Sequence, residues 1–203
     1  MNLQGQVGPQ QAASGAILNV ALGKGAEVLN SEYQGRYYSL AYAGKVFGTS
    51  LQAAIALTTL NSTYTGLLIF NPQGSGINAA VLQCSVAQAT APAGISNMHY
   101  EGTLTSQTTA VTNTTPVAIF NSLFGNTSIA ASGSSRAATL PATPVAVRAL
   151  GGGPVATGSL TSGFTCDDIA GLMILGPGTY LGLGYLTTAI SVVASFYWSE
   201  LPQ

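Results

Sequence analysis

Hydrophobic and polar positions alternate with a period of two in the last part of the chain. From Thr188 to Trp198, the even-numbered positions carry the larger and more apolar side chains. Because successive side chains of a strand point to opposite faces, this alternation predicts a strand with one apolar face. Residues 169–199 contain no charged side chain, but Gly176-Pro177-Gly178 and later Gly and Thr residues interrupt them. A membrane-spanning helix needs about 20 consecutive apolar residues, so we expect no membrane segment here.

Two further apolar runs flank the densest turn signal of the chain. Residues 66–70 and 78–87 are apolar, and residues 71–76 between them read Asn-Pro-Gln-Gly-Ser-Gly. Pro fixes φ and the two glycines supply positive φ, so this segment predicts a turn. We predict that the two runs form a hairpin. The second strand is expected to place Ala80, Leu82, Cys84 and Val86 on one face.

The other segments predict short strands and loops. We expect a strand pair in 33–48, a short helix or a strand in 52–60, strands in 99–112, 116–124 and 145–150, and a polar surface loop in 125–144. Short strands separated by Gly and Pro turns, without a long amphipathic helix, predict an all-β sandwich or barrel. No internal repeat of fixed period is found, which argues against a solenoid or a propeller.

The N-terminal segment differs from the rest of the chain. Residues 1–30 are rich in Gln, Gly and Ala and carry few large apolar side chains before Ile17 to Leu22. This is too little apolar material to fold alone, so the segment is either an extended arm along a neighbouring subunit or a loose terminus. We predict an N-terminal arm in 1–30 and a β-sandwich domain in 31–203. The first residues lack the basic start and apolar core of a secretory signal.

Charged residues are rare. Five Lys or Arg and six Asp or Glu make up 5% of the 203 residues, whereas an average soluble domain has roughly 25%. Charged side chains keep a free surface solvated, so this deficit favours a subunit whose surface is covered by neighbours. A secreted monomer with a Thr- and Ser-rich surface is the alternative. The five basic residues are scattered singly, and so we expect no nucleic-acid partner.

Residues able to carry catalytic chemistry are few. His99 is the single histidine and shares a strand face with Glu101. A His–Glu pair can activate a serine, but no G-x-S-x-G elbow is present, so a polar strand residue is the favoured interpretation. Asp167 and Asp168 would point to opposite faces of a strand. We expect them to cap the segment that begins at Ile169 rather than to bind metal. We predict no enzyme activity, cofactor or metal site.

The cysteines and the Gly-rich segments also give no motif. Cys84 and Cys166 lie too far apart in the sequence for a metal motif. We expect two small buried side chains, with a single disulfide as the alternative. Residues 74–76 lack the Lys of a P-loop, and residues 182–187 lack the third glycine of a dinucleotide site. Turns or close strand contacts explain both.

Tyrosine dominates the aromatic residues, with nine tyrosines and one tryptophan. Tyrosine suits surfaces that bind a partner because its ring packs while its hydroxyl stays hydrated. The tyrosines of 33–42 thus form an interface, a carbohydrate patch or half-buried sheet residues. Our candidate interface adds apolar residues of the arm and of the last strand, and comprises Tyr33, Tyr37, Tyr38, Tyr42, Ile17, Leu22 and Trp198.

Four segments resemble structural proteins of tailed bacteriophages. They are Gly35-Arg-Tyr-Tyr38, Ala43-Gly-Lys-Val-Phe47, Phe70-Asn-Pro-Gln-Gly-Ser-Gly76 and the ending Ser195-Phe-Tyr-Trp-Ser-Glu-Leu-Pro202. The resemblance covers residues 30–203 and implies a jelly-roll-like virion component, commonly a homotrimer, such as a head decoration (cement) protein. It implies assembly in the host cytoplasm, contact with other virion proteins such as the major capsid protein, and no catalytic residues. A tail fibre, baseplate or adhesin subunit that binds a host glycan is the first alternative, and an enzyme that uses His99 is the second.

Overall fold

The computed structural model describes residues 37–90, 94, 96–153 and 164–203. The predicted arm, and with it Ile17, Leu22 and Tyr33 of the candidate interface, lies outside the described residues. The one helix within these ranges is the single turn α1 (Tyr38–Tyr42). No helix in the described part of the chain has the length and the apolar character needed to cross a membrane.

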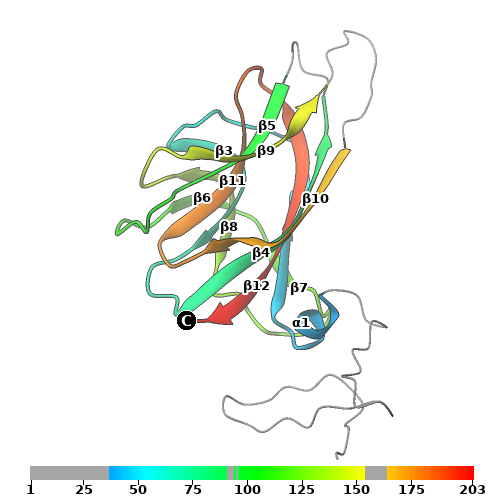
Figure 1. Ribbon diagram of the computed structural model, residues 1–203, viewed down its shortest axis with the longest axis vertical. Helices are drawn as coiled ribbons and strands as arrows, with labels where there is room; N and C mark the ends of the chain where they lie inside the picture. The colour runs from blue at the N-terminus through cyan, green and yellow to red at the C-terminus, as the bar shows by residue number, and fades with distance from the viewer. Residues whose placement is uncertain (1–36, 91–93, 95, 154–163) are drawn as a thin grey trace, which may run out of the picture.

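Twelve strands account for most of the described residues. They are β1 (Val46–Ser50), β2 (Ile55–Ala56), β3 (Thr63–Asn71), β4 (Ile77–Gln88), β5 (Ser96–Gly102), β6 (Thr112–Pro116), β7 (Ile119–Asn121), β8 (Gly133–Thr139), β9 (Val145–Gly153), β10 (Phe164–Leu175), β11 (Thr179–Tyr185) and β12 (Ser191–Pro202). They form two antiparallel sheets packed against each other (Figure 1). The first sheet has the order β10-β4-β12-β1-β7, with β2 beside β12, and the second has the order β6-β8-β3-β11-β5-β9. The predicted all-β sandwich is confirmed.

Eight of these strands have jelly-roll topology. One sheet contains β1-β12-β4-β10 and the other contains β3-β11-β5-β9. Successive strands of this set lie in opposite sheets, except β5 and β9, which are neighbours. This is the double-sheet arrangement of a jelly roll. The strands β6, β7 and β8 are inserted between β5 and β9, and they extend both sheets on the side away from β9 and β10.

The core lies between the two sheets and contains the predicted apolar face of the last strand. Val192, Ala194, Phe196 and Trp198 of β12 are all buried there. They pack with inward side chains of the second sheet, namely Leu67, Ile69, Tyr100, Leu181 and Leu183. The period-two prediction for this segment is therefore confirmed. Each fully buried Leu, Ile or Phe of this kind contributes roughly 1.5–3 kcal/mol.

The predicted hairpin of residues 66–87 is wrong, although both of its strands exist. β3 pairs with β8 and β11, whereas β4 pairs with β10 and β12 in the other sheet. The turn thus carries the chain across the sandwich. Asn71 fixes this crossing, because its Nδ2 donates to the carbonyls of Ile77 at 2.8 Å and Leu175 at 2.9 Å.

A β-bulge also corrects the predicted face of β4. Gln83 pairs with Tyr197, but the next residue of β12, Trp198, pairs with Val81. The extra residue, Leu82, shifts the alternation by one position. The core side of β4 is therefore formed by Ala79, Val81, Cys84 and Val86, and Ala80 and Leu82 are not part of that cluster.

Residues 52–60, for which a helix or a strand was expected, contain the two-residue strand β2. Two other local expectations are wrong. The described part of 33–48 forms α1 and β1 instead of a strand pair. The predicted loop 125–144 contains β8, which is hydrogen-bonded on both sides. Serine hydroxyls make this polar strand possible, since Ser134 Oγ donates to the Leu68 carbonyl and Ser135 Oγ to the Thr115 carbonyl.

Candidate interaction surfaces

The two edge strands β9 and β10 lie on the same side of the sandwich and form a seam between the sheets. β9 pairs with β5 and β10 pairs with β4, and neither has a second neighbour among the described strands. The seam carries large apolar side chains that are exposed to solvent, namely Val145, Val147, Phe164, Leu172 and Ile174. Exposed apolar side chains of this size are common at interaction surfaces.

A hollow of about 280 Å³ opens in this seam. Leu104, Val147, Leu172 and Ile174 line it together with the buried core residues Leu175 and Leu181. Leu172 is 81% exposed and Leu104 is 77% exposed. The hollow therefore has an exposed apolar rim, and the core residues Leu175 and Leu181 beneath it remain buried.

A bulge in β10 places Leu172 at the rim of the hollow. The pairing of β10 with β4 jumps from Asp168 to Met173, so residues 169–172 loop out of the ladder. Ala170 has φ 56° and Gly171 has φ 82°. A left-handed conformation at a residue other than glycine costs roughly 1–2 kcal/mol. Such a bulge bends an edge and hinders the addition of another strand, so this edge offers side chains rather than backbone groups.

The other part of the seam is closed by an ion pair between the sheets. Arg148 of β9 donates through Nη2 to Asp167 Oδ1 of β10 at 3.0 Å, and Tyr100 Oη donates to Asp167 Oδ2 at 3.1 Å. The neighbouring Asp168 faces the other way and accepts from Tyr37 Oη. The two carboxylates thus point to opposite faces as predicted, but they lie within a strand and cap nothing. The described residues contain no cluster of acidic, His and Cys side chains able to hold a metal.

A second apolar surface lies at the opposite edge of the first sheet. Phe120 of β7 stacks on Phe124 with 6.1 Å between ring centroids and meets Tyr197 of β12 edge-on at 5.9 Å. Both Phe120 and Tyr197 lie over Gly48, where a Cβ atom would come within 2.8 Å of each ring. Phe124 is 84% exposed and Ile129, in the same connection to β8, is 92% exposed.

The candidate interface residues are distributed over very different environments. Tyr38 and Tyr42 are exposed and stack with 5.8 Å between ring centroids. Tyr37 contacts Asp168. Trp198 is fully buried in the core, so its place in the candidate interface was wrong. An apolar strand face can turn to either the core or a partner, and sequence alternation alone does not separate these cases.

Sequence reasoning missed Phe120, Phe124 and Ile129. Phe124 and Ile129 lie in or beside a segment rich in Asn, Ser and Gly that predicts a hydrophilic loop. Large apolar side chains within such a loop could have indicated an exposed apolar surface, because a loop at the surface has no core in which to bury them.

The pair His99 and Glu101 is buried beside β11 on the outer face of the second sheet. His99 Nε2 lies 3.4 Å from Glu101 Oε2, which accepts from the Leu60 amide at 3.2 Å. Gly184 makes room for the pair, since a Cβ atom there would lie 2.3 Å from Glu101 Oε2. Both residues are at most 2% exposed, so the imidazole has no access to an external substrate in this conformation.

Burial also changes the acidity of several groups without creating a site. Burial and the nearby Glu101 carboxylate raise the pKa of Tyr64 well above its usual value, and the same causes raise the pKa of Tyr180 to about 12. Burial raises the pKa of Cys84 to about 12. Cys84 is buried while Cys166 is exposed, and both are free thiols. The expectation of two buried cysteines is thus right only for Cys84, and the alternative disulfide is absent.

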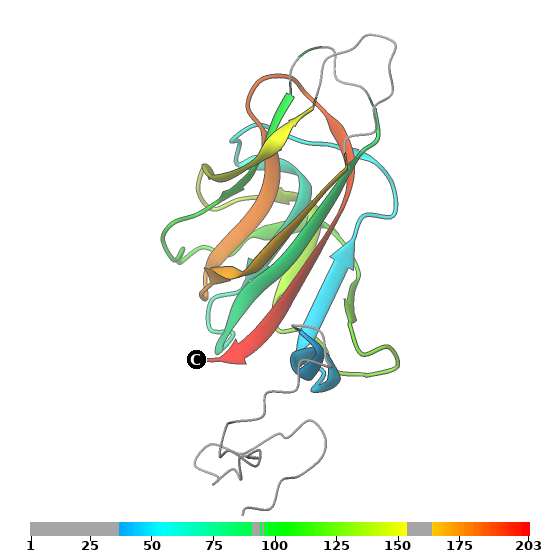
Figure 2. The same ribbon diagram turned by 45° about the vertical axis from the view of Figure 1, so that its right-hand side comes forward.

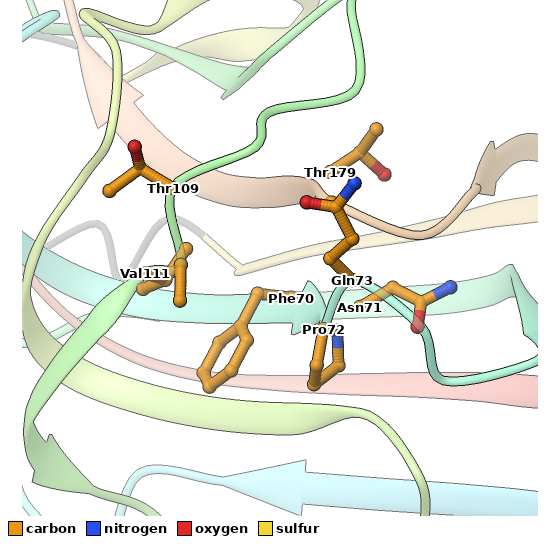
Figure 3. Close-up of a pocket in the computed structure, with 9 residues that line it drawn as sticks. Phe70, Asn71, Pro72, Gln73, Thr109, Val111 and Thr179 are labelled. Atoms are coloured by element: carbon orange, nitrogen blue, oxygen red, sulfur yellow. The ribbon is translucent and has the colours of Figure 1, made fainter.

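A small cavity lies where three connections meet at one end of the sandwich. It is lined by residues 70–73, 109–111 and 178–179 (Figure 3). Its volume is about 30 Å³, comparable to the space of one water molecule, whereas pockets for small organic ligands have roughly 300–1,000 Å³. We do not assign a ligand to it.

Comparison of the chain with protein-family models, curated proteins and solved structures finds no match. The class that the described residues define is an antiparallel jelly-roll sandwich. Its two apolar surfaces, at the β9–β10 seam and around Phe124, are the features that a function has to explain.

Proposed function

We propose that this chain is a structural subunit of a virus particle, of the type that decorates and cements a tailed-bacteriophage head. It forms a homotrimer, binds the major capsid protein, and uses neither membrane nor nucleic acid. The observation that carries the proposal is the hollow in the β9–β10 seam, whose rim exposes the large apolar side chains Leu104, Leu172 and Ile174.

Apolar patches of this kind are unfavourable on a free monomer. Contiguous exposed apolar surface beyond a few hundred Å² marks an interaction site in soluble proteins. With charged residues at only 5% of the chain, few charges keep such patches apart. Covering them with neighbouring subunits removes both problems.

The subunit acts mechanically. A trimer contacts the shell at several points, so patches that bind weakly one by one bind strongly together. Each bound trimer links neighbouring capsomers. These capsomers must therefore separate from the trimer before the shell can open. The jelly roll suits this task, since most of its backbone hydrogen bonds are made within two closely packed sheets.

The test is binding to a phage shell. Purified protein is added to empty heads that lack it, and co-sedimentation and the temperature of shell opening are measured. We expect saturable binding and a higher opening temperature, with fully decorated heads as the control for unspecific binding. Absence of binding at high micromolar concentration would contradict a role in cementing that shell.

The exposed stack of Tyr38 and Tyr42 favours a second candidate function. Aromatic rings that are accessible to solvent are suited to packing against sugar rings, and a tail fibre, baseplate or adhesin subunit would use them to bind a host glycan. A glycan array separates the two functions. Binding that is lost in Tyr38→Ala and Tyr42→Ala, without binding to heads, supports the adhesin.

A further inference from the structure

We infer that the hollow of the β9–β10 seam receives the exposed Phe124 and Ile129 of a second copy of this chain. The knob is defined here as Phe124 and Ile129, and the hollow as the space between Leu104, Val147, Leu172 and Ile174. Copies joined in this way form a head-to-tail ring. The inference deepens the proposed function, since it names the contact through which the subunits associate, and it rests on the self-association that this function requires.

The hollow has the size and chemistry to accept a large apolar side chain. Benzene fits an enclosed cavity of roughly 150 Å³, and the hollow, which is open to solvent, has about 280 Å³. Its rim consists of aliphatic side chains, and its lining includes Leu175 and Leu181 of the core. A phenyl ring placed here would cover the exposed rim side chains.

Phe124, the aromatic residue of the knob, is already held in position by its neighbours. Phe124 stacks on Phe120, and Phe120 contacts Tyr197 of the first sheet. Asn121 Oδ1 accepts from the Leu123 amide at 2.9 Å and thereby fixes the start of the connection. A side chain that is ordered before binding loses little conformational entropy on association.

The knob and the hollow lie at opposite edges of the molecule. β10 is the first strand of the first sheet and β7, which leads into the knob, is the last. Figure 2 shows β4 in green, β12 in red and β1 in cyan side by side between these two edges. One copy cannot fill its own hollow, so the contact joins different surfaces of two copies. Such contacts close into rings when the rotation between copies allows it.

Charge does not oppose a second copy as the occupant. Arg148 and Asp167 of the seam neutralise each other at 3.0 Å, and residues 121–131 carry no charged side chain. Neither surface calls for a partner of opposite charge. The chain itself, with a formal net charge of -1, supplies a neutral apolar partner.

The test uses one variant for each half of the contact. Phe124→Asp removes the knob, Leu172→Asp spoils the hollow, and Leu186→Asp changes an exposed leucine outside both surfaces. Light scattering at low micromolar concentration should give an oligomer for the wild type and Leu186→Asp. Either of the other variants should weaken association at least tenfold, with an unchanged circular dichroism spectrum that shows the fold to be intact.

Mixing the two variants gives the decisive result. The Phe124→Asp protein keeps its hollow and the Leu172→Asp protein keeps its knob, so an equimolar mixture should form a dimer with one copy of each. A contact between identical surfaces would not give this dimer. A wild type that is monomeric, or variants that still associate, would overturn the inference.

Cross-linking provides an independent measurement. In a Cys166→Ser background, Phe124→Cys and Ile174→Cys in one chain should yield covalent oligomers on oxidation, and either change alone should yield monomers. Binding to heads is measured separately with the same wild-type protein. If the wild type associates but does not bind heads, the proposed function is refuted and the contact between copies is not. If the wild type binds heads but Phe124→Asp and Leu172→Asp do not weaken its association, only the contact between the knob and the hollow is refuted.

Discussion

The outer faces of the two sheets have the same alternating pattern but differ in how far their side chains are buried. On the second sheet, Tyr64, Leu68 and Tyr180 form a small additional core with Ala138 and Leu140. On the first sheet, Gln83, Ser85 and Tyr197 remain half-buried. The difference teaches that alternation specifies a face, whereas the connections that pass over it decide whether the face becomes core or surface.

Glycines make the additional core possible. Gly182 and Gly184 alternate along β11, and Tyr64 Oη lies over Gly182, where a Cβ atom would come within 2.6 Å of it. The hydroxyl accepts from the Leu183 amide at 2.9 Å. Among the described residues of the first sheet, a glycine makes room for aromatic rings at Gly48, which lies beneath Phe120 and Tyr197.

The largest expected effect is alkaline unfolding. Burial raises the pKa of Tyr64, Tyr100 and Tyr180 above the usual value near 10. The unfolded chain therefore loses these protons first, so the stabilisation is complete below pH 10 and is lost as the pH rises above it. At pH 11 the three tyrosines together should cost about 4 kcal/mol. The buried Cys84 thiol, whose pKa is raised to about 12, adds to this loss of stability.

Urea unfolding at pH 7, 10 and 11 checks this loss. Two of the three tyrosines lie on the outer face of the second sheet. Tyr64→Phe together with Tyr180→Phe should therefore remove about two thirds of the tyrosine contribution and leave the contributions of Tyr100 and Cys84. A loss of stability at pH 11 that is the same in the double variant would show that the additional core is not its source.

Gly184→Ala should destabilise the protein by about 3 kcal/mol, because overpacking would displace the buried Glu101. The added Cβ atom would lie 2.3 Å from Glu101 Oε2. Gly176→Ala is the matched control, since its nearest neighbour would be Asn78 Oδ1 at 3.8 Å. Denaturant midpoints measure both, and equal midpoints would argue against a closed packing around Glu101.

Carboxylates on the two outer faces should respond differently to removal. Glu101→Ala leaves the Leu60 amide and His99 buried without this partner, at a cost of about 2 kcal/mol. Asp168→Ala changes an exposed residue and should cost less than about 1 kcal/mol. The free energies of unfolding of both variants provide the comparison, and a larger cost at Asp168 would reverse our ranking of the two faces.

Gly48→Ala should cost about 1 kcal/mol, since the half-exposed rings above it can move aside. A Cβ atom would lie 2.7 Å from the Phe120 ring. We expect Phe124 to lose its support as a result and self-association to weaken at least threefold in light scattering. Unchanged association would separate the knob from the aromatic contacts beneath it.

The smallest effect concerns the thiols. A maleimide should label Cys166 in the native protein without changing its stability, while the buried Cys84 should react only after unfolding. Burial raises the pKa of Cys84 to about 12, and this disfavours the reactive thiolate. Two labels per native chain, counted by mass spectrometry, would show that the core opens readily between β4 and β10.

The parts of the fold that were predictable from sequence are those with a strong local pattern. Alternation located β12, and the apolar runs located β3 and β4. The same turn residues suit a hairpin or a crossing between sheets, so the partners of β3 and β4 depend on contacts distant in sequence. β8 was missed because serine hydroxyls bonded to backbone carbonyls replace apolar side chains in its interior.

The candidate surfaces were predictable only in part. The deficit of charge predicts association, which stays a prediction, and Tyr38 and Tyr42 of the candidate interface are exposed. The hollow arises where β9, β10 and the connection after β5 meet, which no local pattern encodes. Trp198 lies in the core because the second sheet covers its face of β12, and sequence periodicity does not reveal which face is covered.

The inserted strands β6, β7 and β8 have a consequence for how such a protein can diversify. The eight jelly-roll strands form two complete four-stranded sheets without them, and the knob lies within the insertion while Val147, Leu172 and Ile174 of the hollow belong to the eight-stranded framework. If copies associate through the knob and the hollow as proposed, the sequence around the knob sets which copies recognise each other. Leu104 of the hollow and Ala138 and Leu140 of the additional core also lie within residues 103–144. An exchange that leaves the framework and the hollow unchanged is therefore confined to the β7–β8 connection that carries Phe124 and Ile129.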